Sequence, residues 1–372
     1  MEILTTVAIM SGIGVFLAAV LVVADRYLNA YGECTITINE GTKELKVNGG
    51  SSLLTTLMEN EIFIPSACGG RGSCGLCKIQ VTAGAGPLLP TEVPYLTPEE
   101  IQEGVRLACQ VKVREDLEVT IPEELFSIRE YVATVTSIRD LTHDIKGLRI
   151  RLPEGEAIHF RAGQYVQIRT PLYGNVEEEV YRAYSLASSE KVHDEIELII
   201  RRVPHGICTT YVFDYLKEGD PIVFNGPYGD FYLRDTDKEI IFMAGGSGLA
   251  PIKSMLYKMR EDGIERKATF FFGCVAKRDL YHLEEMMQLE KELADFRFIP
   301  ALSNPRPEDE WDGETGLITE VVDRYIPERT DAEAYLCGSP GMIDACLEVL
   351  HRKGIGDDSI FFDKFWLLEV VR

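Results

Sequence analysis

CGGRGSCGLC, residues 68–77, is the stretch that most constrains the fold, because three cysteines and four glycines share ten positions. Cys68, Cys74 and Cys77 are followed later by Cys109, in the segment RLACQ. Four thiolates, three from one tight loop and one from a distant segment, can hold a [2Fe–2S] cluster. The glycines allow backbone conformations that a Cβ atom would obstruct, and they let N–H groups approach sulfur. The pattern predicts such a cluster.

Zinc is the main alternative occupant of this loop. Zinc sites usually pair C-x2-C with a second close pair, whereas Cys109 stands alone. The chain has nine cysteines in 372 residues. An odd number is a poor disulfide framework, so the crowded cysteines indicate ligation in a reducing compartment. Their spacing resembles that of plant-type ferredoxins with one extra residue between the first two ligands, which implies a one-electron carrier.

The segments around the cysteine loop have the patterns of a small α+β domain. Residues 34–41 and 77–84 alternate apolar and polar side chains, as half-buried strands do. Between them, SLLTTLMENE at residues 52–61 is typical of a short amphipathic helix. We therefore expect a β-grasp, ferredoxin-like domain over residues 33–124.

A strand-rich region punctuated by Gly and Pro follows, and it predicts a small antiparallel β-barrel over residues 128–234. It contains RAYS at residues 182–185 and GICTT at residues 206–210. An arginine can grip a phosphate with two hydrogen bonds, a tyrosine can lie against an isoalloxazine ring, and a serine can hydrogen-bond its N5 edge. A glycine and hydroxyls at a helix N-terminus can bind an anion.

R-x-Y-S followed by G-x-x-[ST] resembles the flavin signature of the ferredoxin–NADP reductase superfamily. The resemblance implies that FAD is bound by Arg182, Tyr184, Ser185, Gly206, Thr209 and the neighbouring Thr210. Ser185 would also serve catalysis at the flavin N5. Arg201 and His205 flank these segments. We count Arg201 among the cofactor contacts, although solvent-exposed charge is the alternative for both residues.

From residue 238 to residue 366 strands alternate with helices, which predicts a parallel α/β sheet. A strand runs into GGSGLAP, residues 245–251, at a helix start, where backbone can approach a pyrophosphate. This is not the G-x-G-x-x-G fingerprint. It resembles the G-x-G-x-x-P turn of the same superfamily, and YLCGSPGM at residues 335–342 resembles its C-G-x-P-x-M segment.

The resemblance implies a nicotinamide site in this sheet. Its expected contacts are Gly245, Gly246, Gly248, Pro251, Cys274, Cys337 and Gly338. Cys337 would lie beside the nicotinamide C4 and the flavin N5 and would organise hydride transfer by positioning donor and acceptor; a buried structural thiol is the alternative. The sequence shows no obvious Ser-Arg cluster that would bind the 2′-phosphate of NADPH, so we expect NADH as the substrate. Lys277 and Arg278 keep NADPH as an alternative.

Residues 3–24, ILTTVAIMSGIGVFLAAVLVVA, contain no charged side chain. A helix of this length spans about 33 Å, which matches the hydrocarbon core of a bilayer. A cleaved signal peptide would need a basic start, and only Glu2 is present. A buried core helix would show polar positions at helical spacing. We therefore expect a single transmembrane helix over residues 3–25, surrounded by lipid, with Arg26 on the cytoplasmic side.

The composition indicates a folded protein of 45% hydrophobic and 26% charged residues. Its formal net charge of −22 argues against nucleic acid, which binds through Lys and Arg. Together the four predicted parts form a multidomain chain: a transmembrane helix, a [2Fe–2S] domain, a FAD barrel and an NAD(H) domain.

That order of parts most resembles the F-subunit family of the sodium-translocating NADH:quinone oxidoreductases. The resemblance implies electron flow from NADH to FAD, to the cluster, to membrane partner subunits and finally to quinone. It also implies an inner-membrane location with the other domains in the cytoplasm. The family usually ends after a D-D-F-G-G-like segment whose aromatic lies near the flavin. Here Phe365 keeps that aromatic and is counted among the cofactor contacts, but the bulky tail WLLEVVR that follows it departs from the pattern.

Two other functions fit the same motifs. The reductase of a multicomponent oxygenase has the same kinds of domain but is normally soluble. The second is an electron-transfer protein that has lost its flavin or nicotinamide site. The intact RAYS, GGSGLAP and CGSP segments argue against it.

Overall fold

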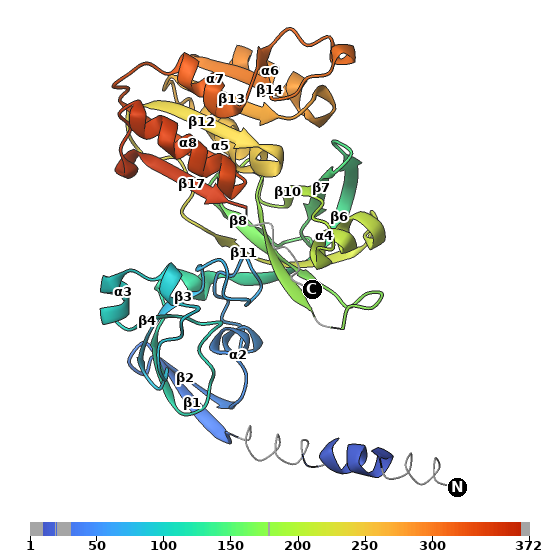
Figure 1. Ribbon diagram of the computed structural model, residues 1–372, viewed down its shortest axis with the longest axis vertical. Coiled ribbons are helices and arrows are strands. Elements are labelled where there is room, and N and C mark those ends of the chain that lie inside the picture. The colour runs from blue at the N-terminus through green and yellow to red at the C-terminus, as the bar shows by residue number, and fades with distance from the viewer. Residues whose placement is uncertain (1–9, 19, 21–30, 178, 366–372) are drawn as a thin grey trace. The chain divides into compact units, whose positions relative to one another are not determined.

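The computed structural model describes residues 10–18, 20, 31–177 and 179–365 (Figure 1). The chain divides into two compact units. Unit 1 comprises residues 1–66 and 70–127, and unit 2 comprises residues 67–69 and 128–372.

More than half of the expected membrane segment, residues 3–25, lies outside the described residues. Residues 10–18 and 20 are helical. Within the described part of the chain, no helix has the combined length and apolar character that crossing a membrane requires.

Unit 1 is built on a five-stranded sheet with the order β2-β1-β5-β3-β4. β1 and β5 run parallel, and the other neighbours are antiparallel. Alternate residues of β1 are buried, and α2 buries Leu53, Leu54 and Leu57. The expected α+β arrangement is confirmed. The elements are β1 (Glu33–Ile38), β2 (Lys43–Asn48), α2 (Leu53–Glu59), β3 (Lys78–Ala83), η1 (Val93–Tyr95), α3 (Pro98–Gln102), β4 (Val105–Leu107), β5 (Leu117–Thr120) and η2 (Glu123–Ser127).

The first part of unit 2 is a six-stranded antiparallel sheet with the order β10-β7-β6-β11-β8-β9. A bridge between Leu186 and Leu198 links the chain just after β9 to β10, so the sheet closes as the expected barrel. The elements are β6 (Arg129–Asp140), β7 (Ile145–Arg151), β8 (Tyr165–Thr170), β9 (Val180–Ser185), β10 (Glu195–Arg201), α4 (Ile207–Thr210), η3 (Tyr211–Tyr215) and β11 (Pro221–Tyr228).

The second part of unit 2 is a parallel six-stranded sheet with the order β15-β14-β13-β12-β16-β17. Ile240 and Phe242 of β12 pack with α5 and α6, whereas Ile241 and Met243 pack with α7 and α8. Helices thus cover both faces, which explains why the strands are apolar along their length. The elements are β12 (Glu239–Gly245), η4 (Gly246–Gly248), α5 (Leu249–Asp262), β13 (Ala268–Cys274), η5 (Lys277–Asp279), α6 (Leu283–Glu292), β14 (Phe296–Leu302), η6 (Pro307–Asp309), β15 (Glu314–Thr315), α7 (Ile318–Tyr325), β16 (Ala332–Gly338), α8 (Pro340–Arg352), η7 (Asp357–Ser359) and β17 (Ile360–Lys364).

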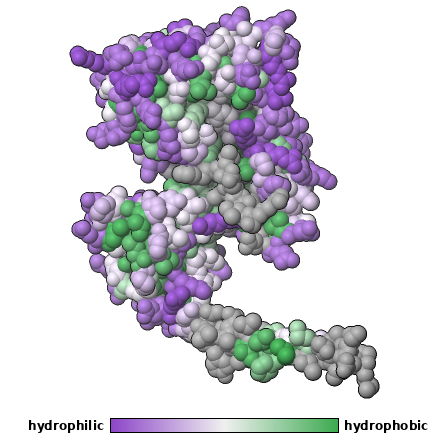
Figure 2. All heavy atoms as spheres, in the orientation of Figure 1, coloured by the Kyte–Doolittle hydropathy of each residue, from purple (hydrophilic) through white to green (hydrophobic). Residues whose placement is uncertain are grey.

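The surface of this second part is mostly hydrophilic in the view of Figure 2, as the large net charge leads us to expect.

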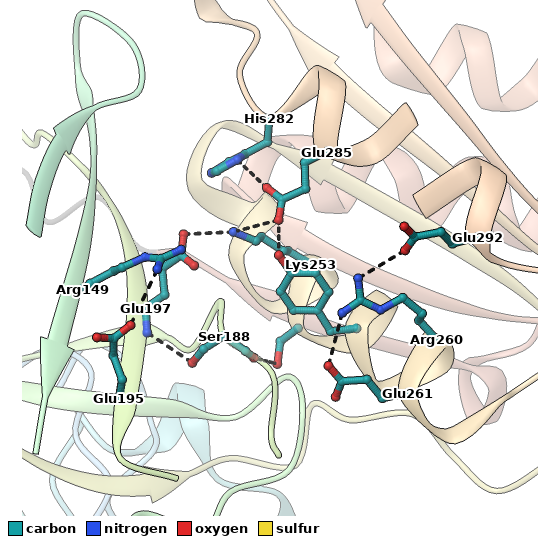
Figure 3. A network of polar contacts seen from close by, with 12 residues as sticks. Arg149, Ser188, Glu195, Glu197, Lys253, Arg260, Glu261, His282, Glu285 and Glu292 are labelled. Atoms are coloured by element: carbon teal, nitrogen blue, oxygen red, sulfur yellow. Dashed lines mark hydrogen bonds and ion pairs between the residues drawn. The ribbon is translucent and has the colours of Figure 1, made fainter. Parts of the chain in front are cut away.

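A buried lysine joins the two parts of unit 2 (Figure 3). Lys253 of α5 is 2% exposed, and its Nζ lies 2.9 Å from Glu197 of β10 and 3.4 Å from Glu285 of α6. Tyr257 donates a hydrogen bond to Glu285, and the His282 Nδ1 lies 2.6 Å from the same carboxylate. Although burial opposes it, these partners lower the pKa of Glu285 to about 2. Because β10 belongs to the barrel, the network fixes α5 against it.

Lys253→Met is expected to lower the free energy of unfolding of unit 2 by about 3 kcal/mol. The variant leaves Glu197 and Glu285 without their cation, and both carboxylates keep some solvent contact, which places the cost at the lower end of the range for a broken buried pair. Urea unfolding measures the difference. Lys291→Met, at an exposed position of α6, is the matched control and should stay within about 0.5 kcal/mol of the parent. Equal losses in both variants would contradict the role given to Lys253.

Candidate functional site

Three of the four predicted cluster ligands come together in unit 1. The side chain of Cys77 hydrogen-bonds that of Cys109, and Cys74 lies close enough to act on it electrostatically. The bond to Cys109 and burial raise the pKa of the Cys77 thiol far above its ordinary value. The backbone N–H of Ala108 donates to the carbonyl of Cys77 at 2.8 Å, which fixes the two segments to each other. Cys68 is buried as well.

The loop between these cysteines needs glycine at two positions, because a side chain there would be strained and would collide with neighbouring residues. Gly72 and Gly75 both have φ near +70°, and a Cβ atom at Gly75 would lie 2.7 Å from the Tyr95 ring. The Ser73 hydroxyl is buried and has no hydrogen-bond partner within the described residues. In the same residues, no three Cys, His, Asp or Glu side chains are arranged to hold a single metal ion. The fit to a cluster therefore rests on the thiol donors, on the glycine conformations of the loop and on the buried Ser73 hydroxyl, which could donate a hydrogen bond to cluster sulfur.

The two segments expected to bind flavin meet at one end of the barrel. Tyr184 of β9 hydrogen-bonds the thiol of Cys208 in α4, and burial raises the pKa of both groups. The charge of Arg182 acts on both of them. The Nη1 of Arg182 donates to the Tyr181 carbonyl at 2.7 Å. The RAYS and GICTT segments are thus neighbours, as a shared ligand would require.

Thr209 and Gly206 have a local role in this arrangement. The Thr209 hydroxyl accepts from the Val203 N–H and lies 3.2 Å from the Val203 carbonyl and 3.3 Å from that of Gly206. It closes the turn before α4. Thr210 is only partly buried and hydrogen-bonds the Tyr173 hydroxyl. The assignment of Gly206, Thr209 and Thr210 to a pyrophosphate stays a prediction.

The glycine turn after β12 lies directly against the end of β16. A Cβ atom at Gly248 would lie 2.1 Å from the Cys337 carbonyl oxygen, so no other residue fits there. Tyr281 donates to the Gly246 carbonyl at 2.7 Å and fixes the turn. Arg201 lies close by, with its Nη1 3.2 Å from where a Cβ of Gly246 would stand. Its Nε donates to Asp144 at 2.8 Å. Arg201 therefore lies at the glycine turn where the nicotinamide nucleotide is expected.

The remaining expected nicotinamide contacts surround the same turn. Pro251 is buried in the first turn of α5, and a Cβ at Gly245 would lie 2.8 Å from the Met342 sulfur. Cys274 ends β13, where burial raises its pKa to about 12 and its thiol donates to the Asp279 carbonyl at 3.4 Å. At these glycine positions a Cβ atom would collide with neighbouring atoms. The bare backbone at the start of the 14-residue helix α5 therefore forms a cradle suited to a dinucleotide pyrophosphate.

Ser185, Cys337 and Asp363 gather from three different strands. β16 and β17 pair in parallel with Cys337 opposite Asp363, and the Ser185 hydroxyl donates to the Asp363 carboxylate at 3.4 Å. Cys337 is completely buried, and this burial raises its pKa well above the ordinary value. Desolvation raises the pKa of Asp363 to about 6, although the bond from Ser185 opposes the shift. Phe365 is half-buried and its N–H donates to the Gly338 carbonyl at 2.8 Å.

Asp363 is the residue that the motifs did not reveal. It lies two positions before Phe365, in a segment that sequence reasoning considered only for its aromatic. The sequence signal that could have revealed Asp363 is a carboxyl group two residues before that aromatic.

Comparison with known proteins agrees with this architecture. Residues 36–114 match the 2Fe-2S iron-sulfur cluster binding domain, residues 132–232 the oxidoreductase FAD-binding domain and residues 242–348 the oxidoreductase NAD-binding domain. An Amycolatopsis cytochrome P450 reductase is similar in structure, with a TM-score of 0.71, 29% identity and 89% of this chain and 98% of that chain covered. The ferredoxin reductase of a carbazole 1,9a-dioxygenase follows with a TM-score of 0.68, 27% identity and coverages of 90% and 99%. Fold and site define a flavin- and iron–sulfur-dependent oxidoreductase.

Relatives of similar sequence show to which family of these oxidoreductases the chain belongs. The F subunit of the Na(+)-translocating NADH-quinone reductase of Neisseria meningitidis is 37% identical, over 98% of this chain and 100% of the relative. The protein of the same name from Idiomarina loihiensis is 36% identical, with coverages of 95% and 98%. The chain belongs to the F-subunit family of the Na(+)-translocating NADH-quinone reductases.

The pH dependence of stability should report on Asp363. Its pKa of about 6 in the folded protein lies above the ordinary 3.8, so the folded state binds this proton more tightly. The resulting stabilisation is complete below about pH 4 and is lost as the pH rises through 6. Between pH 5 and pH 8 the parent should lose about 1 kcal/mol relative to Asp363→Asn, measured by urea unfolding at each pH. Asp312→Asn, at an exposed loop position, is the control. A difference independent of pH would refute the assignment.

Proposed function

We propose that the chain is the NADH-oxidising subunit of a membrane quinone reductase. It accepts two electrons from NADH and passes them singly, with FAD and a [2Fe–2S] cluster as carriers, to membrane partner subunits and on to quinone. The observation that carries this proposal is the meeting of Ser185, Cys337 and Asp363 beside the glycine turn. The names of the relatives, which cover nearly the whole chain, support the same activity.

The residues present suit both nucleotides. Arg182 and Tyr184 would hold the flavin, while the Gly246–Gly248 turn and the N-terminus of α5 would hold the NADH pyrophosphate. Arg201 adds a cation at that turn. When bound, FAD supplies a two-electron acceptor that can release electrons one at a time.

The residues at the meeting point would have distinct tasks. The raised pKa keeps Cys337 a neutral thiol, so it is suited to hold donor and acceptor in contact and not to act as a nucleophile. Asp363 accepts the Ser185 hydrogen bond and thereby fixes the orientation of that hydroxyl. Apolar packing around Cys337 excludes water from the transfer path.

The reductase of a multicomponent oxygenase is the second candidate, because structures of that kind share the fold. The higher identity and coverage of the quinone reductase relatives favour the first candidate. Partners would then be the other subunits of an inner-membrane complex, and any coupling to sodium would belong to them.

Residues 3–25 would anchor the chain in the membrane as a single helix, with the other domains in the cytoplasm; their uncharged sequence up to residue 24 supports this proposal. We expect the full chain to sediment with membranes in carbonate buffer and a variant lacking residues 3–25 to stay in the supernatant. Both forms should bleach flavin with NADH, which shows that the deletion leaves the site folded. A full chain that remains soluble without detergent would favour the oxygenase reductase.

Cys74→Ala should abolish the cluster EPR signal while NADH still bleaches the flavin at the parental rate. The reason is that Cys74 is expected to ligate iron, whereas hydride transfer depends on residues of unit 2. Cys337→Ala is the reciprocal control: it should slow bleaching about tenfold in stopped flow and keep the EPR signal of the dithionite-reduced cluster. Loss of flavin bleaching in Cys74→Ala, or bound zinc in place of iron and acid-labile sulfide in the parent, would overturn the assignment.

A further inference from the structure

The residue after the last cluster cysteine carries a side-chain amide that faces the ligand sulfur. The Nε2 of Gln110 donates to the Cys109 Sγ at 3.5 Å, and its Oε1 accepts from the Thr91 hydroxyl at 2.9 Å. A thiolate can only accept a hydrogen bond, and an amide oxygen cannot donate one. The sulfur therefore selects the amide orientation in which N–H groups point at it, and the Thr91 hydroxyl, which can donate or accept, donates to the Oε1 that this orientation presents.

A buried ion pair holds the segment that carries Thr91. Glu92 is 0% exposed and Arg106 is 6% exposed. Arg106 donates to Glu92 through Nε at 3.0 Å and through Nη2 at 2.6 Å. Glu92 also accepts from the N–H groups of Leu89 and Leu107, at 2.9 Å and 3.0 Å. Both charges are thus satisfied from several directions, which a buried pair needs to be stable.

The guanidinium of Arg106 binds the same segment at its other end. It donates to the carbonyl oxygens of Ala85, Gly86 and Pro87 at 3.0–3.3 Å. Arg106 lies in β4, three residues before Cys109. Residues 85–92 are therefore fixed to the very strand that leads to the ligand.

The amide of Gln110 also contacts the cysteine loop. A Cβ atom at Gly72 would lie 2.6 Å from its Nε2, so the glycine leaves the space that the amide occupies. The side chain thus lies between Gly72 and Cys109, and its position is set on three sides.

We propose that Gln110 is a positioning residue that raises the reduction potential of the cluster, with Thr91 orienting its amide and the Glu92–Arg106 pair holding Thr91 in place. This inference rests on the proposed ligation of a cluster by the four cysteines. Hydrogen bonds to ligand sulfur stabilise the more negative, reduced cluster. Neutral amide hydrogens act in this direction, whereas a carboxylate at the same place would act against it.

The test is an EPR-monitored redox titration of the full-length holoprotein. At the potential where half of the parental cluster is reduced, Gln110→Met should show a ratio of reduced to oxidised cluster about tenfold lower, which is a shift of about 59 mV for one electron. Gln110→Glu should lower the ratio further. Gln80→Met is the matched control, because Gln80 donates instead to the Glu103 carbonyl and should leave the ratio unchanged.

A second pair of variants leaves Gln110 in place. Thr91→Val removes the hydroxyl at nearly equal volume and should lower the ratio, whereas Thr91→Ser keeps the hydroxyl and should restore it. Equal potentials in the parent, Thr91→Val and Gln110→Met would overturn the proposal. If Gln110→Met fails to assemble a cluster, the Thr91 pair decides. Absence of iron and acid-labile sulfide from the parent would instead refute the ligation on which the inference rests.

Discussion

The close approach of the Gly248 backbone to the end of β16 governs the geometry of unit 2. A Cβ atom there would collide with the Cys337 carbonyl, so the turn can lie against the strand only because the side chain is missing. The parallel register then places Asp363 opposite Cys337, and the barrel contributes Ser185 to the same point. The glycine therefore lets the turn lie beside Cys337 and Asp363, as a transfer between a donor and an acceptor in contact would require.

The buried lysine at position 253 extends this constraint from the turn to the barrel. α5 starts at the glycine turn and carries Lys253 in its second turn, where it reaches Glu197 of β10. Without that link the helix that would hold the dinucleotide and the barrel that would hold the flavin could shift separately. The cost of burying the charge is offset because two carboxylates share it. Alignment of two binding surfaces is a physical reason for a charge inside an otherwise apolar contact.

The sequence predicted the layers of the fold because periodicity and glycine spacing are local properties. The parallel sheet, the barrel and the α+β unit all follow from patterns within short windows. Asp363 and Lys253 could not be found in that way, since their surroundings depend on strand register and on packing between elements far apart in the chain. Arg201 shows the same limit: its charge was visible, but its place beside Gly246 depends on how β10 meets the turn. The roles of the motif residues toward FAD remain predictions for the same reason.

The two candidate redox sites are controlled by different physical means. Around Cys337, burial dominates and raises the pKa values of a thiol and a carboxyl, which suits a transfer that must exclude water. Around Cys109 the control would be hydrogen bonding, through the Gln110 amide that donates to the Cys109 sulfur. A cluster changes its net charge when an electron arrives, and dipoles that point at sulfur respond to that charge directly. The Gln110 amide and Cys109 both belong to unit 1, so this control would act within that unit.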